Sequence, residues 1–324
     1  FVSMSPALPP GRKVIALSGG IGGAKLALGL KHILASDSLT VIANTADDFE
    51  HMGLAISPDI DTLVYTLAGL SDTERGWGRA GETWTFMAAL EALGGETWFN
   101  LGDGDLAMHV LRSARLAKGD GLTAITADIS ATLNVGARIL PMSDQPVRTR
   151  LRTSDGWLDF QDYFVGRQAQ PMVSEIAYSG VKAAQPAPGL IETLHGNDVA
   201  AIVICPSNPL ISIEPILAVP GIRQALADAT APVVAVSPII DGEAVKGPTA
   251  KMLLELGYSA TATTVLQRYE DLIDIYIADP RDMKALTAIR PRASIVPADI
   301  MMVTFDDRKR LARTVMDVAL GNAV

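Results

Sequence analysis

The sequence predicts an α/β protein with a Rossmann-like, mostly parallel sheet, helices on both faces of that sheet, and an inserted, mainly helical second lobe. Three observations support this fold class. A glycine-rich turn at residues 19–23 joins an apolar run to an amphipathic helical pattern. Residues 199–204 and 233–236 are wholly apolar, as strands covered on both faces are. Between these regions, residues 71–198 have a different residue pattern, which interrupts the alternation of strands and helices.

The first 70 residues contain the pattern of a βαβ unit. Residues 14–17 form an apolar run that predicts a strand, 26–34 have helical spacing, and 39–43 predict a second strand. Two strands joined by a helix within about 30 residues are typical of a parallel sheet. Residues 61–70 predict a further helix by the same spacing.

The inserted region combines helices with short strands. Helical patterns at 83–93 and 106–117 carry Trp, His and Arg side chains. Residues 148–151 and 157–160 alternate like short strands on either side of a Ser-Asp-Gly turn at 154–156. These features predict a lobe of its own rather than a continuation of the parallel sheet.

The pattern of buried parallel strands resumes after a proline-rich loop at 185–189. Beyond the two apolar runs already named, the sequence predicts a helix at 222–229, a strand at 273–277 and a final helix at 306–320. We therefore assign a discontinuous core to 13–70 plus 199–324, the inserted lobe to 71–198, and a lead segment or tag remnant to 1–12.

Composition limits the classes of function. The chain has 324 residues, of which 48% are hydrophobic and 19% charged, as in globular proteins. Its formal net charge of −9 argues against a nucleic-acid surface. No apolar run approaches the roughly 18 residues of a membrane span, so we expect no membrane partner. The single cysteine, Cys205, excludes an internal disulfide and a cysteine zinc site and favours a cytoplasmic location.

The glycine-rich turn is a candidate phosphate-binding loop. Glycines let backbone N–H groups approach an anion, and a helix N-terminus adds partial positive charge. The spacing is not a Walker A loop, because Ala24 precedes Lys25, and Lys25 also occupies the last glycine position of a dinucleotide fingerprint. A tight turn without a ligand is the alternative. The candidate phosphate-binding residues are Gly19, Gly20, Gly22, Gly23 and Lys25.

Two acidic segments follow the second predicted strand. Asp47 and Asp48 lie where ligands of open α/β sheets bind, and adjacent carboxylates there suit Mg²⁺. A solvated turn or a helix cap explains them equally well. Asp59 and Asp61 begin the next predicted helix, where capping needs only one of them. The other is available as a general base or as an acceptor for a ligand hydroxyl.

Three further segments are candidates for ligand contact. Trp77 stands between glycines and arginines, which suits stacking on a planar ligand, although an aromatic ring covering the core is as good an explanation. Asp103 lies in an acidic turn before a helix, where an N-cap is the alternative. Ser207, Asn208 and Ser212 follow an apolar strand and form a second candidate anion site. Because parallel strands end at one edge of a sheet, we expect these loops to converge.

Taken in order, the motifs resemble those of one family. They are Ser18-Gly19-Gly20-x-Gly22, Asn44-Thr45-x-Asp47-Asp48, Ser57-Pro58-Asp59-Ile60-Asp61-Thr62, Leu101-Gly102-Asp103, Pro141-Met142-Ser143-Asp144, Phe160-Gln161-Asp162, Pro206-Ser207-Asn208-Pro209-x-x-Ser212-Ile213 and Ser237-Pro238-Ile239. In order and spacing they resemble the 2-phospho-L-lactate transferase (CofD) family of coenzyme F-420 biosynthesis. The resemblance runs from about Lys13 to the C-terminal helix.

The resemblance implies a reaction. A guanosine-diphosphate donor would pass its phospho-acid group to the terminal ribityl hydroxyl of the deazaflavin Fo, releasing GMP, with Mg²⁺ as cofactor. The acid is 2-phospholactate, phosphoenolpyruvate or 3-phosphoglycerate, a choice that the sequence leaves open. The resemblance also implies a homodimer. A non-catalytic nucleotide-sugar-binding regulatory protein on the same core is the alternative.

The resemblance also implies roles for particular residues. Asp61 matches the second aspartate of the family's Ser-Pro-Asp-x-Asp motif and would contact Fo and orient or deprotonate its hydroxyl. Asp48 is the other catalytic candidate, and Asp47 and Asp48 would hold Mg²⁺. The implied Fo-binding residues are Asp61, Asn100, Trp77 and Asp103. The family often has a cation where this chain has Asn100 and Gly104, so two cations are missing near the expected Fo site.

Overall fold

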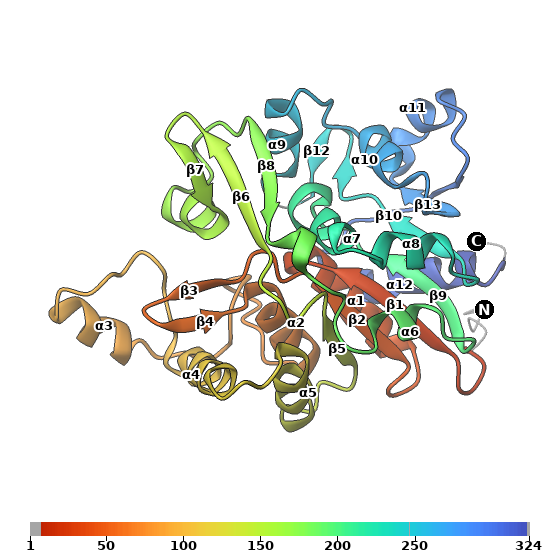
Figure 1. Ribbon diagram of the computed structural model, residues 1–324. Helices are drawn as coiled ribbons and strands as arrows, with labels where there is room; N and C mark the ends of the chain where they lie inside the picture. The colour runs from red at the N-terminus through yellow and green to blue at the C-terminus, as the bar shows by residue number, and fades with distance from the viewer. Residues whose placement is uncertain (1–7, 246, 323–324) are drawn as a thin grey trace.

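A computed structural model describes residues 8–245 and 247–322 and shows the α/β fold that the sequence predicts (Figure 1). Residues 1–7, 246 and 323–324 lie outside the described residues, so the lead segment predicted for 1–12 is described only from residue 8. Among the helices of the described ranges, none is long and apolar enough to cross a membrane.

The core is a seven-stranded sheet in which every neighbouring pair of strands is parallel. The strand order is β14-β13-β10-β9-β1-β2-β5. The strands are β1 (Lys13–Ser18), β2 (Leu39–Ala43), β5 (Arg138–Pro141), β9 (Val199–Ile204), β10 (Val233–Val236), β13 (Ile275–Ala278) and β14 (Ser294–Pro297). All five strands predicted for the core are confirmed, the last of them shifted by one or two residues to β13.

Two strands of this sheet were not predicted, and both lie at its edges. β5 falls inside 71–198 yet pairs with β2, with Ala43 opposite Pro141, so a core strand interrupts the predicted lobe. β14 pairs with β13 at the opposite edge. Each strand has four residues, with a polar residue at its start and a proline at its end, which leaves too short an apolar run to predict a strand.

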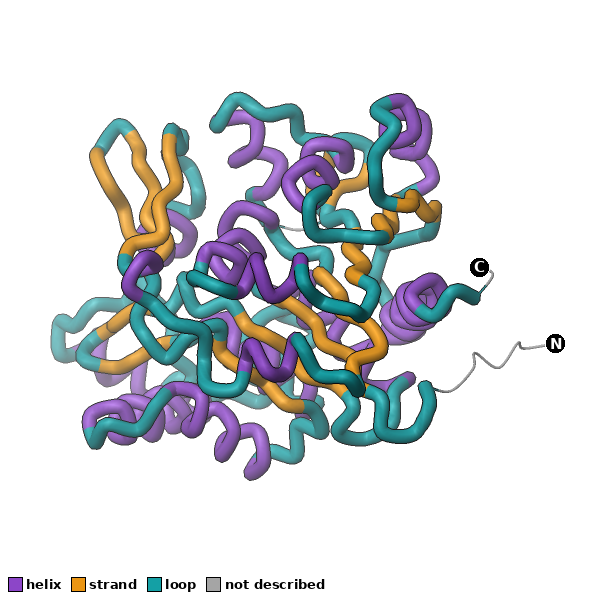
Figure 2. The backbone as a smooth tube through the Cα atoms, turned by 45° about the vertical axis from the view of Figure 1, so that its right-hand side comes forward, coloured by secondary structure: helices purple, strands orange, loops and turns teal. Residues whose placement is uncertain are grey.

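Alternate side chains of β1 divide the core into two hydrophobic clusters, one on each face of the sheet. Val14 and Ala16 belong to one cluster, and Ile15 and Leu17 to the other. The first cluster is covered by α1 (Gly20–Ile33), α2 (Pro58–Ala68), α5 (Leu122–Thr132) and α12 (Phe305–Ala319). The second is covered by α6 (Leu190–Leu194), α7 (Glu214–Ala218), α8 (Ile222–Ala227), α9 (Thr249–Glu255), α10 (Ala262–Tyr269) and α11 (Met283–Ala288). Figure 2 shows helices on both sides of the strands.

The remaining elements surround this core. The helices α3 (Thr85–Ala92) and α4 (Asp103–Ala117) confirm the two helices predicted for the lobe. A three-stranded antiparallel sheet, in the order β7-β6-β8, stands apart from the main sheet in both views (Figures 1 and 2). Its strands are β6 (Arg148–Thr153), β7 (Gly156–Asp159) and β8 (Glu175–Ser179), of which the first two were predicted.

Short hairpins and turns complete the chain. The two hairpins are β3 (Phe49–His51) with β4 (Leu54–Ile56) and β11 (Ile239–Ile240) with β12 (Glu243–Ala244). The π-helical turns are η1 (Asp162–Gly166) and η3 (Pro209–Ile213), and the 3₁₀ turns are η2 (Val181–Ala183) and η4 (Pro280–Asp282).

Local chemistry fixes the ends of the helices that frame the site. α2 begins at Pro58, whose missing N–H costs nothing in the first turn, and it ends at Ala68, before Gly69, which adopts the left-handed conformation with φ 73°. α12 begins with a capping box in which Thr304 and Asp307 each bond to the other's backbone N–H.

Candidate functional site

The loops that follow β1, β2 and β9 meet at the carboxyl edge of the sheet. β1 lies between the other two strands, so the chain leaves it toward β2 and later returns on its other side. Such a switch point is where open α/β sheets bind their ligands. Asn44, after β2, donates from Nδ2 to the carbonyl oxygen of Ile211 at 3.1 Å, which ties the second loop to the third. The structure therefore brings the predicted loops together.

The glycine-rich turn is packed against the loop after β9. The backbone N–H of Gly19 donates to Ser207 Oγ at 3.2 Å, and that hydroxyl donates back to the carbonyl oxygen of Gly19 at 2.7 Å. A Cβ on Gly22 would lie 2.7 Å from the carbonyl oxygen of Pro206, and one on Gly23 would overlap the hydroxyl of Ser207. The close approach of α1 to this loop therefore accounts for two of the glycines.

Gly20 is different from its neighbours. It has φ +64°, and no atom lies within 4 Å of the place where its Cβ would be. Its N–H, the first of α1, donates to Oδ1 of Asp59 at 2.8 Å. An aspartate of the chain thus occupies one donor at the helix N-terminus where a phosphate was expected.

The remaining predicted anion-binding side chains also bond within the chain. Lys25 donates from Nζ to the carbonyl oxygen of Met302 at 3.0 Å, on the side of α1 that faces the start of α12. Asn208 caps η3 by accepting the N–H of Leu210 at 2.9 Å, and Ser212 packs against Gly19. The structure brings Ser207 and Ser212 to the glycine loop, while Lys25 bonds to Met302 and also lines a pocket described below.

Four aspartates are buried at the same edge: Asp47, Asp48, Asp59 and Asp61. Asp48 Oδ2 accepts a hydrogen bond of 2.7 Å from Ser57. Oδ1 of Asp47 and Oδ1 of Asp48 are buried and receive no hydrogen bond from any described residue. A buried carboxylate oxygen without a donor is costly unless a cation faces it. These two oxygens are therefore the best candidates to hold a hard divalent metal ion.

The environment of this cluster raises carboxyl pKa values. Burial raises the pKa of Asp48 to about 7, against the lowering effect of Arg148. Burial raises the pKa of Asp59 to about 6, against its hydrogen bonds from Asn44 and Gly20. The pKa of Asp47 is raised well above its ordinary value by burial and then by Asp59 and Asp48. Such crowding of acids is typical of functional sites and disfavours full ionisation without a counter-ion.

Asp61 is the member of the cluster that directly contacts a guanidinium. Both of its carboxylate oxygens contact the guanidinium of Arg112, which α4 contributes. His109 Nδ1 lies 3.6 Å from Asp61 Oδ2, and His109 Nε2 lies 3.1 Å from Asp105. Arg112 is not among the site residues predicted from the sequence. His109 and Arg112 are at i and i+3 of the helix predicted for 106–117, and Asp105 precedes it by one residue, so their spacing is that of side chains on one helix face.

The residues expected at the Fo site have different surroundings. Asp103 caps α3, because its carboxylate accepts the hydroxyl of Thr83 and the N–H groups of Thr85 and Phe86 at 2.5–3.0 Å. This is not the N-cap given above as the alternative to ligand contact, because α4, the helix that follows, begins at Asp103 itself and has no side-chain cap hydrogen bond. Asn100 is exposed in the loop before α4. The space beside Gly104, where the family often has a cation, is filled by the guanidinium of Arg79.

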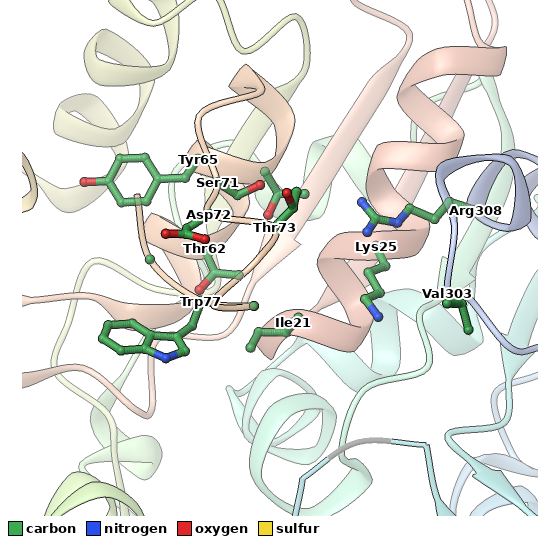
Figure 3. Close-up of a pocket in the computed structure, with 13 residues that line it drawn as sticks. Ile21, Lys25, Thr62, Tyr65, Ser71, Asp72, Thr73, Trp77, Val303 and Arg308 are labelled. Atoms are coloured by element: carbon green, nitrogen blue, oxygen red, sulfur yellow. The ribbon is translucent and has the colours of Figure 1, made fainter. Parts of the chain in front are cut away.

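Trp77 is 47% exposed, with the guanidinium of Arg75 4.8 Å from its ring centre. It lines a pocket with Ile21 of α1 and with Thr62 and Tyr65 of α2 (Figure 3). Thr62 directly follows Asp61, so the pocket adjoins the turn of α2 that carries the cluster. The other residues lining it are Lys25, Thr66, Ser71, Asp72, Thr73, Gly76, Gly78, Val303 and Arg308.

The parallel sheet and its convergent loops place the chain among open α/β proteins, whose ligand sites lie at the carboxyl edge of the sheet. The family model of 2-phospho-L-lactate transferase CofD matches residues 14–322. The chain belongs to this family, which confirms the resemblance found in the motifs.

Individual relatives agree with this assignment. A phosphoenolpyruvate transferase from Kitasatospora aureofaciens is 42% identical over 315 residues, covering 95% of this chain and 98% of the relative. A 2-phospho-L-lactate transferase from Methanosarcina mazei is 38% identical over 304 residues, covering 94% and 99%. A solved structure of a UPF0052 family protein from Bacillus halodurans superimposes with a TM-score of 0.64 at 19% identity, covering 94% and 99% of the two chains. That structure supports the fold alone.

Proposed function

We propose that this protein transfers a phospho-acid group from a guanosine-diphosphate donor to the terminal ribityl hydroxyl of the deazaflavin Fo, in the biosynthesis of coenzyme F-420. The observation that carries the proposal is membership of the CofD family over residues 14–322. The buried carboxylates at the switch point of the sheet, and a pocket lined by Thr62 of the helix that carries Asp61, suit such a transfer.

In the proposed reaction, the acceptor hydroxyl oxygen forms a bond to the phosphorus next to the acid. The bond from that phosphorus to the bridging oxygen breaks, and GMP leaves with the bridging oxygen. Asp61 accepts a hydrogen bond from the attacking hydroxyl and receives its proton. Transfers of this kind depend on positioning and charge neutralisation more than on a strong base. A carboxylate held in one orientation by Arg112 suits that requirement.

Mg²⁺ fits the residues present, and Asp47 and Asp48 would hold it through the two oxygens that lack a donor. When bound, it would neutralise charge on the transferred group. Trp77 and Thr62 would contact the deazaflavin in the pocket of Figure 3. The donor phosphates would lie at the switch point, near the glycine loop, where Gly20 now bonds to Asp59 and Gly19 to Ser207.

The test is a transfer assay with Fo, GTP, Mg²⁺, a donor-forming guanylyltransferase and each of 2-phospholactate, phosphoenolpyruvate and 3-phosphoglycerate. Mass spectrometry should find a phospho-acid adduct of Fo together with GMP, and the best substrate identifies the donor. If no acid gives an adduct and Fo does not bind, the regulatory nucleotide-sugar-binding alternative replaces the transferase. We also expect the protein to be a homodimer in the cytoplasm. Sedimentation of the purified protein would test the oligomeric state.

A further inference from the structure

Arg112 is buried to 1% exposure although an arginine is usually found at the surface. Its Nη1 lies 3.3 Å from Oδ2 of Asp61, and its Nη2 contacts Oδ1 of the same carboxylate. Nη1 also lies 3.2 Å from the carbonyl oxygen of Ala55. The guanidinium therefore spans both oxygens of Asp61, and it reaches them from α4 while Asp61 lies in the first turn of α2.

A second contact joins the same two helices one turn away. Tyr65, which follows Asp61 by four residues on α2, donates from its hydroxyl to Oδ1 of Asp105 at 2.6 Å. His109 lies between the two contacts, 3.1 Å from Asp105 and 3.3 Å from Nη1 of Arg112. One face of α4 thus carries Asp105, His109 and Arg112, and it packs against the face of α2 that carries Asp61 and Tyr65.

The spacing of Asp61, Asp105 and His109 also suits a metal ion, because one ligand atom of each lies within 4.8 Å of the others. The guanidinium of Arg112 argues against a metal there. It already pairs both oxygens of Asp61, and a second positive charge beside it would be repelled. Asp61, Asp105, His109 and Arg112 therefore form an ion-pair network. Arg112 is the arginine among these four residues and supplies the positive charge.

We propose that Arg112 is a positioning residue for the transfer: it fixes the plane in which the Asp61 carboxylate faces the acceptor hydroxyl. A carboxylate rotates freely about its last side-chain bond, and a bidentate guanidinium removes that freedom. This inference rests on the proposed function, because Asp61 contacts the acceptor only in that reaction. Arg112 itself is buried behind Asp61 and acts through it.

A positioning role makes a specific kinetic prediction. Loss of the bidentate contact lowers kcat, because the hydroxyl is no longer aligned, and leaves donor binding unchanged. A misplacement of about 1 Å in such a group reduces the rate by roughly 100-fold. Lysine is not an adequate replacement, since it offers a point charge in place of a planar fork.

The experiment compares Arg112→Lys and Arg112→Met with the unmodified enzyme in the transfer assay. We expect kcat to fall by about 100-fold in both variants while KM for the donor stays within about 2-fold. Arg112→Ala should regain part of its activity when guanidinium is added below denaturing concentrations. A purely structural role predicts neither the separation of kcat from KM nor this rescue.

Arg115→Met is the matched control. Arg115 lies on the same helix and also bonds two carboxylates, Asp120 at 2.6 Å and Asp128 at 2.5 Å, but it has no contact with Asp61. Its loss should leave kcat unchanged. If Arg112→Met fails to fold, Arg112→Lys and His109→Gln decide the question by the same kinetic separation.

The possible failures are distinguishable. A folded Arg112→Lys variant with the kcat of the unmodified enzyme overturns the positioning role and leaves the proposed transfer intact. An equal fall in kcat for Arg115→Met also overturns it, because the effect would then belong to α4 as a whole. Absence of transfer by the unmodified protein overturns the proposed function, and the positioning role with it.

Discussion

The backbone N–H of Gly20 donates a hydrogen bond of 2.8 Å to Oδ1 of Asp59. This contact joins the start of α1 to the start of α2 and brings a negative charge to a helix end that carries partial positive charge. Asp59 Oδ2 is held in turn by Nδ2 of Asn44 at 2.9 Å. The carboxylate of Asp59 thus lies at the glycine loop. A phosphate bound at this loop would be close to that negative charge.

We predict that Asp59→Asn strengthens the binding of GMP in metal-free buffer. Removing one negative charge at a helix N-terminus favours an anion there by up to about 1 kcal/mol, or roughly 5-fold in Kd. Isothermal titration calorimetry measures this directly. Asp306→Asn is the control, since it makes the same charge change at an exposed position of α12. Equal affinities in the Asp59 variant and the unmodified protein would show that GMP does not approach this loop.

The packing of α1 makes a second prediction. A Cβ on Gly23 would overlap the hydroxyl groups of Ser18 and Ser207, both of which are buried. We expect Gly23→Ala to destabilise the protein by about 1–3 kcal/mol, because the core there has no room. Urea unfolding measures the change.

Gly104→Ala is the matched control for Gly23→Ala. Gly104 also lies in a helix, but the atom nearest to an added Cβ is Nη1 at the end of Arg79, a side chain that is 36% exposed. We expect no loss of stability there, and the better helix propensity of alanine adds up to about 1 kcal/mol. Similar unfolding midpoints for the two variants would show that α1 can move away from the loop after β9.

The fold could be predicted because its signals are local. Val14 to Leu17 and Val199 to Ile204 are apolar runs, and the glycine turn marks the strand-to-helix connection, so neighbouring residues suffice to identify these elements. β5 is an exception. It is a four-residue strand whose place in the sheet depends on pairing with β2, a contact across about 100 residues that no local pattern records.

The site could be predicted only in part, for the same physical reason. Asp47, Asp48 and Asp59 follow or precede predicted elements, and strand ends converge in any parallel sheet. Arg112 gains its role from the docking of α4 against α2, which brings a side chain 51 positions away onto Asp61. The direction of the Lys25 side chain on α1, which brings it to Met302, is likewise set by the packing of α1 and is not recorded in the glycine motif.

The buried acids should make the stability of the metal-free protein depend on pH. The pKa of Asp48 is about 7 and that of Asp59 about 6 in the folded state, against about 4 in an unfolded chain. The folded protein therefore binds these protons more tightly, so its unfolding free energy decreases as pH rises from about 4 to 7. We expect Asp48→Asn to make this decrease shallower, as measured by Tm in EDTA across that range.

Mg²⁺ should oppose this loss of stability. A cation that binds the ionised carboxylates of the folded protein raises Tm, and the increase should be larger at about pH 8 than at about pH 5.5, where protons compete. In Asp48→Asn the increase should be smaller at both pH values. If Mg²⁺ raises Tm equally in the variant and the unmodified protein, Asp48 does not hold the metal.

Trp77 permits a test of the pocket that is separate from the acidic cluster. The ring is half-exposed and rests on Arg75, so its removal leaves no cavity in the core. We expect Trp77→Ala to raise KM for Fo by about 10-fold, the value of one aromatic stacking contact, with little change in Tm. Trp157→Ala is the control, because Trp157 is 40% exposed on β7 and does not line the pocket. A KM for Fo that changes equally in both variants, or in neither, would place the deazaflavin ring outside the pocket of Figure 3.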